Sequence, residues 1–194
     1  MPPREPPFTT EPLPEGGPTV APETLHNLKA YLLELINADR VSFGLPPVEL
    51  GSNLAAQDHA EEMLDHSYVS HWGLDGMKPY MRYALAGGVN YEIENVSGIP
   101  SPPQAGVRYQ TVSPWEELRK AEKGWMESSG HRSNILNPWH RRVNIGIACN
   151  RTTCAAVQQF EGDYVEFEGL PTLSSGMLTV AGKLLEGFEF SAIT

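Results

Sequence analysis

Basic residues, cysteines and long hydrophobic runs are all scarce in this sequence of 194 residues. Lys and Arg number 14 against 24 Asp and Glu, so the formal net charge is −10. Binding to nucleic acid or to an anionic membrane surface needs concentrated positive charge, and we therefore expect no nucleic-acid partner. No apolar stretch approaches the ~20 residues of a membrane-spanning helix, so we expect no transmembrane segment.

The N-terminal segment lacks the hydrophobic core of a signal peptide and the periodicity of a folded element. Eight of the 17 prolines fall within the first 22 residues, which predicts a flexible, proline-rich tether over residues 1–24. Either the protein is cytosolic, or an export signal has been removed ahead of this sequence.

The two cysteines, Cys149 and Cys154, border the polar segment 150–153. Runs of β-formers flank this segment, so it is predicted to turn a hairpin in which facing cysteines can meet disulfide geometry. A disulfide would indicate an oxidising compartment. A reduced pair and half of a metal site are the alternatives.

Apolar residues at helical spacing predict four helices in the first two thirds of the chain. They cover about residues 25–43, 53–66, 77–86 and 114–127. Ser52 or Asn53 is expected to cap the second helix, and Ser128 to Gly130 are expected to end the fourth.

The pattern then changes to short β-rich runs. Residues 143–148, 155–160 and 164–167 are divided by polar turn segments. An antiparallel sheet covered by the predicted helices is an α+β fold, a three-layer α-β-α sandwich. We assign this domain to residues 25–168.

Residues 169–194 show another strand–turn–strand pattern with too little material for a core of their own. We interpret them as a β-rich extension, which is either packed on the main domain or the start of a truncated second domain.

The common catalytic motifs GxGxxG, GxxxxGK, HExxH and GxSxG do not occur. The chemistry must then come from histidines and carboxylates. His71 follows the second predicted helix beside Trp72, and His131 lies in a polar run after Gly130. Both positions can aim an imidazole into a cleft. His59 is interpreted as a histidine at the edge of the core.

Glu94 lies in the run Tyr91–Val96, where a period of two places Ile93 and Glu94 on opposite faces of a strand. Without further information, Glu94 would simply lie on the solvent face.

Several blocks of the sequence occur in an order that resembles one known family, the bacterial branch of the CAP superfamily (cysteine-rich secretory proteins, antigen 5 and pathogenesis-related 1 proteins), also called the SCP domain. The resemblance covers about residues 25–167. The blocks are LLELINADRVSFGLPPVEL, LAAQDHAEEML, YVSHWGLDGMKPYMRYALAGG, YEIEN, WMESSGHRSNIL and VNIGIA.

The resemblance implies a secreted or surface-attached protein with a cavity lined by two histidines and one or two glutamates. His71, Glu94 and His131 match family positions. Ile93 replaces the family's glycine before Glu94. In eukaryotic relatives a second glutamate follows a tryptophan, and Glu127 lies one position short of that spacing, while Glu122 lies one turn earlier.

Two imidazoles and a carboxylate can coordinate a divalent ion such as Zn²⁺, so His71, Glu94 and His131 are candidate metal ligands as well as candidate catalytic residues. No cofactor is required by the pattern. We favour a non-enzymatic module that binds a small apolar ligand, a cell-wall or surface component, or a metal. The alternative is a metal-assisted hydrolase, a peptidase or esterase, that uses the same cavity.

Overall fold

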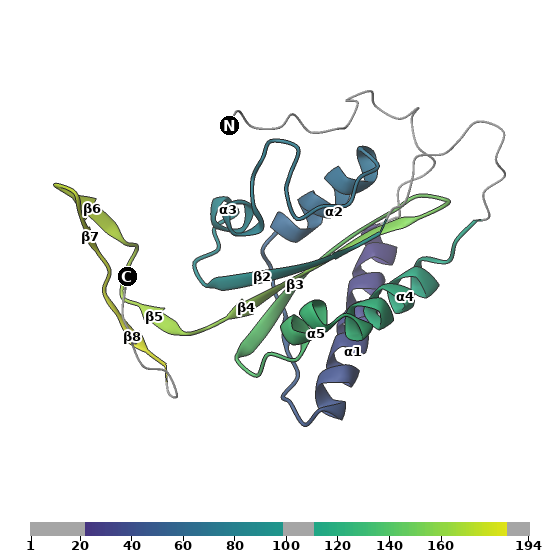
Figure 1. Cartoon of the computed structure of the whole chain (residues 1–194), viewed down its shortest axis with the longest axis horizontal. Coiled ribbons are helices and arrows are strands. Elements are labelled where there is room, and N and C mark those ends of the chain that lie inside the picture. Colours follow the sequence, from purple (N-terminus) through teal and green to yellow (C-terminus); the bar gives the residue numbers. More distant parts are fainter. Residues whose placement is uncertain (1–21, 99–110, 186–194) are drawn as a thin grey trace.

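The computed structural model describes residues 22–98 and 111–185, whose main part is a sheet between two layers of helices (Figure 1). The four strands are β1 (Glu49–Leu50), β2 (Tyr91–Ser97), β3 (His140–Cys149) and β4 (Cys154–Gly162). Their order across the sheet is β1-β3-β4-β2. β2 is therefore an edge strand, which leaves one side of it open to both helical layers.

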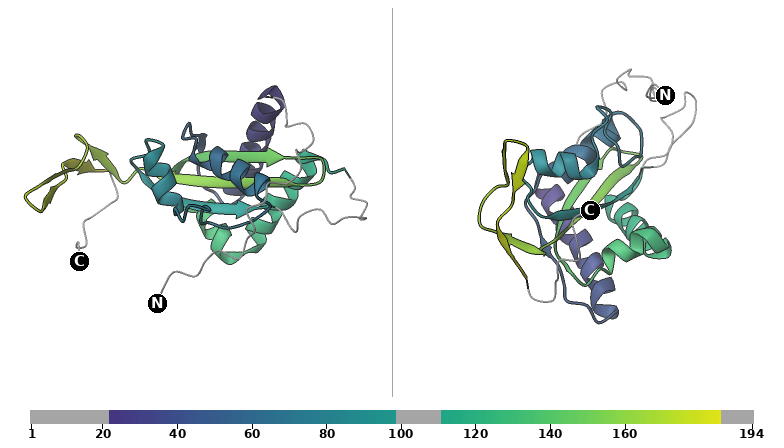
Figure 2. Two further views of the ribbon diagram at one scale, coloured as in Figure 1. Left: turned by 90° about the horizontal axis from the view of Figure 1, so that it is seen from above. Right: turned by 60° about the vertical axis from the view of Figure 1, so that its left-hand side comes forward.

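Five helices cover the two faces of this sheet. α1 (Pro22–Ser42), α4 (Pro114–Glu127) and α5 (Ser129–Ile135) lie on one face, and α2 (Ala55–Asp65) and α3 (Pro79–Leu85) lie on the other (Figures 1 and 2). The predicted α+β sandwich of three layers is confirmed.

The sheet is mixed rather than wholly antiparallel. β2, β3 and β4 are antiparallel neighbours, but β1 pairs with β3 in the parallel direction, with Glu49 opposite Arg142. After α1 the chain runs along the sheet edge for only two residues, and it does so in the same direction as β3. A strand so short has no alternation that the sequence could reveal.

The four predicted helices are present in the predicted order, with differences at their ends, and a fifth helix, α5, was not predicted. α4 has the predicted bounds, and α2 begins at Ala55, where the side chain of Asn53 accepts a hydrogen bond from the Ala55 amide at 3.0 Å. The predicted break after α4 is a single extended residue, Ser128, and α5 follows at once. Seven residues are too few for a recognisable helical period.

The hairpin of β3 and β4 holds the predicted disulfide. Cys149 and Cys154 are paired in register, and their sulfurs are bonded at 2.05 Å. The side chain of Asn150 accepts hydrogen bonds from the amides of Thr152 and Thr153 at 2.9 and 3.1 Å. This short-range bonding fixes the turn that brings the two cysteines together.

The apolar core lies mainly between the sheet and α1, α4 and α5. We call the buried apolar residues of this face the larger core cluster: Leu28, Leu32, Ile36, Val48, Leu118, Trp125, Ile135, Val143, Ile145, Ile147, Cys149, Cys154, Ala156 and Phe160. The opposite face buries a smaller set: Ala56, Ala60, Met63, Tyr68, Ala148, Ala155 and Val157.

Beyond the sandwich the chain forms two small ribbons that extend away from it (Figure 1). β5 (Val165–Phe167) pairs with β8 (Gly182–Leu184), and β6 (Thr172–Ser174) pairs with β7 (Met177–Thr179). Most of the tether expected over residues 1–24 lies outside the described residues, although α1 already begins at Pro22. Among the helices that the structure describes, none has the length and apolar character to cross a membrane.

Candidate functional site

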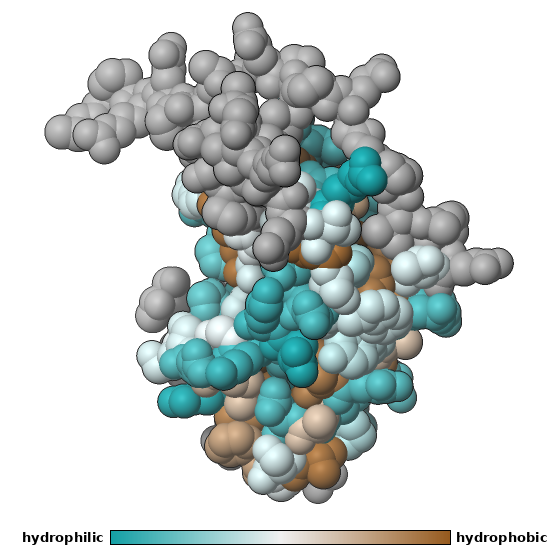
Figure 3. Space-filling model, turned by 90° about the vertical axis from the view of Figure 1, so that its right-hand side faces the viewer, coloured by the Kyte–Doolittle hydropathy of each residue, from teal (hydrophilic) through white to brown (hydrophobic). Residues whose placement is uncertain are grey.

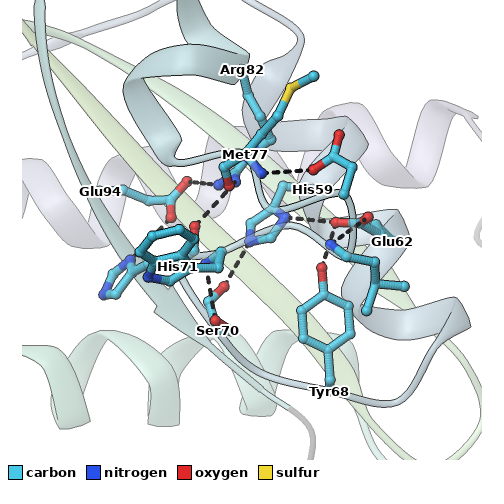
Figure 4. A network of polar contacts seen from close by, with 11 residues as sticks. His59, Glu62, Tyr68, Ser70, His71, Met77, Arg82 and Glu94 are labelled. Carbon is cyan, nitrogen blue, oxygen red and sulfur yellow. Dashed lines mark hydrogen bonds and ion pairs between the residues drawn. The ribbon is translucent and has the colours of Figure 1, made fainter. Parts of the chain in front are cut away.

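His71 lies in the loop between α2 and α3, and its imidazole touches the sheet. Its Nδ1 is 3.0 Å from Oε1 of Glu94, while 46% of the side chain is exposed (Figure 4). Because Nδ1 faces a carboxylate, the other ring nitrogen is left to face solvent or a ligand. A carboxylate behind an imidazole fixes its tautomer and orientation.

Glu94 is buried, so the interpretation of this strand residue as solvent-facing is wrong. Its side chain projects from β2 toward α3 and is 1% exposed. Arg82 of α3 donates from Nη2 to Oε2 of Glu94 at 2.9 Å. The period of two indicated the correct face of β2, but it could not show that a helix covers that face.

Arg82 holds both the carboxylate and the loop that carries His71. Its Nη1 donates to the backbone carbonyl oxygens of His71 at 3.1 Å and Met77 at 2.9 Å. The side chain is 11% exposed. Sequence reasoning missed this residue, because one arginine on a short helix has no pattern that separates it from a surface charge.

A second group of contacts fixes the start of the same loop. His59 of α2 is 1% exposed; its Nε2 donates to the carbonyl of Ser70 at 2.7 Å, and its Nδ1 lies 3.2 Å from Oε2 of Glu62. Tyr68 donates its hydroxyl to the same Glu62 oxygen (Figure 4). The amide of Leu74 donates to Oε1 of Glu62 at 3.2 Å. His59 is thus a buried structural residue beside the site.

His131 reaches the open edge of β2 from the other helical layer, on α5. Its carbonyl accepts a hydrogen bond from Nδ2 of Asn95 at 3.2 Å, and Asn134 donates to Oδ1 of Asn95 at 2.8 Å. Burial, followed by the positive charge that His71 can carry, lowers the pKa of His131. The two predicted histidines are therefore electrostatic neighbours, although they belong to opposite layers.

The structure does not bring Glu127 into this arrangement. Its side chain is 68% exposed and pairs with Lys123 at 3.7 Å on the surface of α4. Glu122, one turn earlier, is buried instead. Gln158 donates to its Oε2 and also accepts from Asn95 at 3.0 Å, so Glu122 connects to the residue that holds His131. Burial and then the charge of Asp39 raise the pKa of Glu122 to about 8.

Two pockets adjoin the histidines. A pocket of about 360 Å³ is lined by His71, Glu92, Glu94, Tyr80 and other residues. A larger one of about 480 Å³ lies between α4 and the disulfide hairpin and includes His131. In the view of Figure 3, hydrophobic and hydrophilic residues are interspersed over the coloured surface.

The donor atoms fit a divalent ion only in part. Both oxygens of Glu94 already have partners, one of them a guanidinium, so this carboxylate is better placed to orient His71 than to coordinate. Within residues 22–98 and 111–185, no three His, Cys, Asp or Glu side chains form a group that could hold a metal. Zinc sites usually have three or four protein ligands, and the described side chains around His71 do not complete such a set.

Comparison with known proteins agrees with this fold. The model of the CAP domain, the cysteine-rich secretory protein family, matches residues 33–160. An uncharacterized Bacillus subtilis (strain 168) protein, YkwD, is 31% identical over 153 residues, which are 74% of this chain and 51% of that protein. The chain thus spans about half the length of this relative.

Two solved structures share the fold. An extracellular protein containing an SCP domain from Bacillus anthracis superposes with a TM-score of 0.58 at 19% identity, over 76% of this chain and 45% of that one. An outer surface protein from Borrelia burgdorferi gives 0.56 at 17% identity, over 76% of this chain and 98% of that one. The family model, the relative in Bacillus subtilis and the α-β-α sandwich agree, and the chain belongs to the CAP (cysteine-rich secretory protein) family.

Proposed function

We propose that this protein is a non-enzymatic binding module that works outside the cytoplasm, and that its pocket beside His71 takes a small ligand or an exchangeable divalent ion. The observation that supports this proposal most directly is the fixed orientation of His71. Glu94 contacts its ring, and Arg82 donates a hydrogen bond to its backbone carbonyl as well as to Glu94. A side chain held from two sides loses little conformational entropy when it binds. An imidazole on an unsupported loop would not have this advantage.

The lining of the pocket beside His71 disfavours hydrolysis by a side-chain nucleophile. Its residues include His71, Glu92, Glu94 and Asn134, but no serine, threonine or cysteine that could act as a nucleophile. A metal-assisted hydrolase is the second candidate, because a carboxylate-oriented histidine is also common behind catalytic metals. A bound ion would supply Lewis acidity and an activated water. His71 and His131 would hold it, and Glu94 would orient His71.

A location outside the cytoplasm is supported by the disulfide, since such bonds persist mainly in oxidising compartments. The two structural relatives are described as an extracellular protein and an outer surface protein. A small apolar ligand and a cell-wall or surface component are both compatible with a pocket of this size.

The test of the ion site is calorimetric titration of tag-free protein with Zn²⁺. We expect the double variant His71→Ala, His131→Ala to lose uptake while its circular dichroism stays unchanged. The matched control is His26→Ala, His66→Ala, which removes two exposed histidines from α1 and from the end of α2. Undiminished Zn²⁺ binding in the first double variant would remove the assignment of the site.

The choice between binding and hydrolysis needs a separate assay. Wild-type protein with Zn²⁺ is incubated with a broad library of peptides and esters, and the His71→Ala, His131→Ala variant serves as the blank. We expect no difference between the two proteins. Cleavage that depends on the two histidines would replace the binding proposal with the hydrolase.

A further inference from the structure

The two small ribbons beyond the sandwich form one continuous hairpin, residues 165–184, which we call the β-arm (Figures 1 and 2). The amide of Glu168 donates to the carbonyl of Ala181 at 3.0 Å, which extends the β5–β8 pairing toward the β6–β7 pair. The tip is a two-residue turn of Ser175 and Gly176, with φ of 51° and 78°. Positive φ at both positions is typical of the type I′ turn that closes a twisted hairpin.

The base of the β-arm is fixed to the sandwich. Directly before the arm, Oδ1 of Asp163 accepts a hydrogen bond from Nη2 of Arg142 on β3 at 2.7 Å. The ring of Tyr164 packs edge-on against that of Tyr91 on β2, with 5.4 Å between the ring centroids. The amide of Leu185 donates to the carbonyl of Tyr164 at 3.1 Å and joins the two strands of the arm at their base. The arm therefore leaves the sandwich in a set direction.

The alternation of side chains gives the β-arm one apolar face. Residues directly opposite each other in a ladder share a face. Leu173 is opposite Leu178, and Val165 is opposite Leu184. With the period of two along each strand, the residues of this apolar face are Val165, Phe167, Leu173, Leu178, Val180 and Leu184. The other face is mostly polar and carries Glu166, Thr172, Ser174, Met177, Thr179 and Lys183.

Much of this apolar face is exposed to water. Leu173 is 73% exposed, Leu178 is 64% exposed and Val180 is 51% exposed. A two-stranded ribbon is marginally stable alone in water and becomes stable when further strands or a second layer cover its apolar side. A partner that covers the face removes this apolar surface from water, which favours association.

The distribution of charge favours a second copy of this chain as the partner. Residues 169–182 contain no Asp, Glu, Lys or Arg, although the chain as a whole has a net charge of −10. Two chains of that charge repel each other, and contact through uncharged arms that extend away from the sandwich keeps most of the charges apart. An anionic membrane surface would repel the whole chain, and the apolar face offers a basic partner no opposite charge. Contact through the same face on both copies closes as a two-fold dimer.

We propose, independently of the proposed function, that two copies of the chain dimerise by packing the apolar faces of their β-arms against each other. Two ribbons stacked about 10 Å apart, as in a β-sandwich, form a two-layer core that one ribbon cannot form. A ribbon with about nine residues in each strand is roughly 30 Å long and roughly 10 Å wide. The dimer therefore buries less than about 1,200 Å² in total, which is the size of a reversible interface.

The test is sedimentation equilibrium of the full chain from about 5 to about 500 µM, the range in which a small interface dissociates. Leu173→Lys, Leu178→Lys places two charges on the apolar face. The matched control, Thr172→Lys, Thr179→Lys, places two charges directly opposite each other on the other face. Both double variants add the same charge and the same repulsion across the ladder, so they differ in the face that they change.

We expect the wild type and the threonine variant to form reversible dimers with equal dissociation constants. The leucine variant should dimerise at least tenfold more weakly, while the circular dichroism of its sandwich and its Zn²⁺ uptake stay those of the wild type. A wild type that stays monomeric at about 500 µM would overturn the proposal, and binding of that monomer to phosphatidylcholine vesicles would identify a lipid surface as the partner instead.

Three other results would also overturn the proposed dimer. A leucine variant that dimerises like the wild type would place the interface elsewhere on the chain. Equal weakening in both double variants would mean that the apolar face has no special role. Oligomers that grow beyond two copies would exclude closed two-fold packing. An intact dimer without Zn²⁺ uptake would instead remove the proposed ion site and leave the β-arm interface in place.

Discussion

The two faces of the central sheet bury different kinds of side chain. The face under α1, α4 and α5 carries the larger core cluster, with Leu32 and Phe160 fully enclosed. The face under α2 and α3 carries fewer and smaller apolar residues, and near the edge strand it carries the polar group of Arg82, Glu94 and Glu92. β2 contributes to both, because Ile93 packs against the larger core cluster while its two glutamate neighbours point the other way.

This difference indicates a division of roles between the faces. Apolar burial supplies most of the free energy of folding, so the larger core cluster can carry stability. The other face buries the charge of Glu94, which is paired with Arg82 as burial of a charge requires. The larger face also buries two ionisable residues, Arg40 and Glu122, which bond to backbone carbonyls and to Gln158. The candidate site lies where the polar face meets the open edge of β2, the place at which His131 also arrives from the opposite layer.

The largest effect on stability is expected in the larger core cluster. Leu32→Ala removes a side chain that is fully buried on α1, and such truncations cost about 2–5 kcal/mol through lost burial and the cavity left behind. The measurement is urea unfolding followed by circular dichroism, with Zn²⁺ titration of the folded variant expected to match the wild type.

Its matched control is Leu85→Ala on α3, where the leucine is 74% exposed. We expect a change of less than about 0.5 kcal/mol there, as for most surface substitutions. Equal losses of stability for the two variants would contradict the division between the faces.

A smaller effect is expected from the disulfide, which closes the β3–β4 hairpin. Cys149→Ala, Cys154→Ala should lower the free energy of unfolding by about 2 kcal/mol, because a cross-link over so short a loop restricts the unfolded chain only modestly. The measurement is urea unfolding with and without a reductant. The reductant should lower the free energy of unfolding of the wild type and leave that of the variant unchanged. If the reductant also destabilised the variant, the loss of stability could not be assigned to the disulfide.

Local sequence patterns predicted the parts of this fold that depend on local interactions. The bounds of α4 and the pairing of Cys149 with Cys154 follow from a helical period and from a polar turn between β-formers. α5 and β1 are too short to show any period, and both were missed.

The candidate site was predictable to a smaller extent. His71, Glu94 and His131 were named on a family resemblance and their order in the chain, and the structure places Nδ1 of His71 3.0 Å from Oε1 of Glu94. Arg82 and Glu92 depend on how α3 covers β2, which is a tertiary contact between segments that no local pattern relates. The same contact explains why Glu94, which alternation alone would place in solvent, is buried and paired.

The face under α1, α4 and α5 also buries a carboxyl group with a raised pKa, Glu122, which gives the smallest expected effect. Glu122 lies on the apolar side, is 3% exposed and has a pKa of about 8, against 4.5 in a free side chain. The folded chain therefore binds more protons at this group than the unfolded chain, so wild-type stability should fall as pH rises from about 5 through about 8. Glu122→Gln resembles the protonated form. Near pH 5 its unfolding midpoint should match the wild type, and near pH 9 it should be higher. Because Glu122 is outside the pocket beside His71, Glu122→Gln should leave the uptake of Zn²⁺ unchanged in calorimetric titration. A loss of uptake in Glu122→Gln would mean that the two faces are coupled through Gln158 and Asn95 rather than divided.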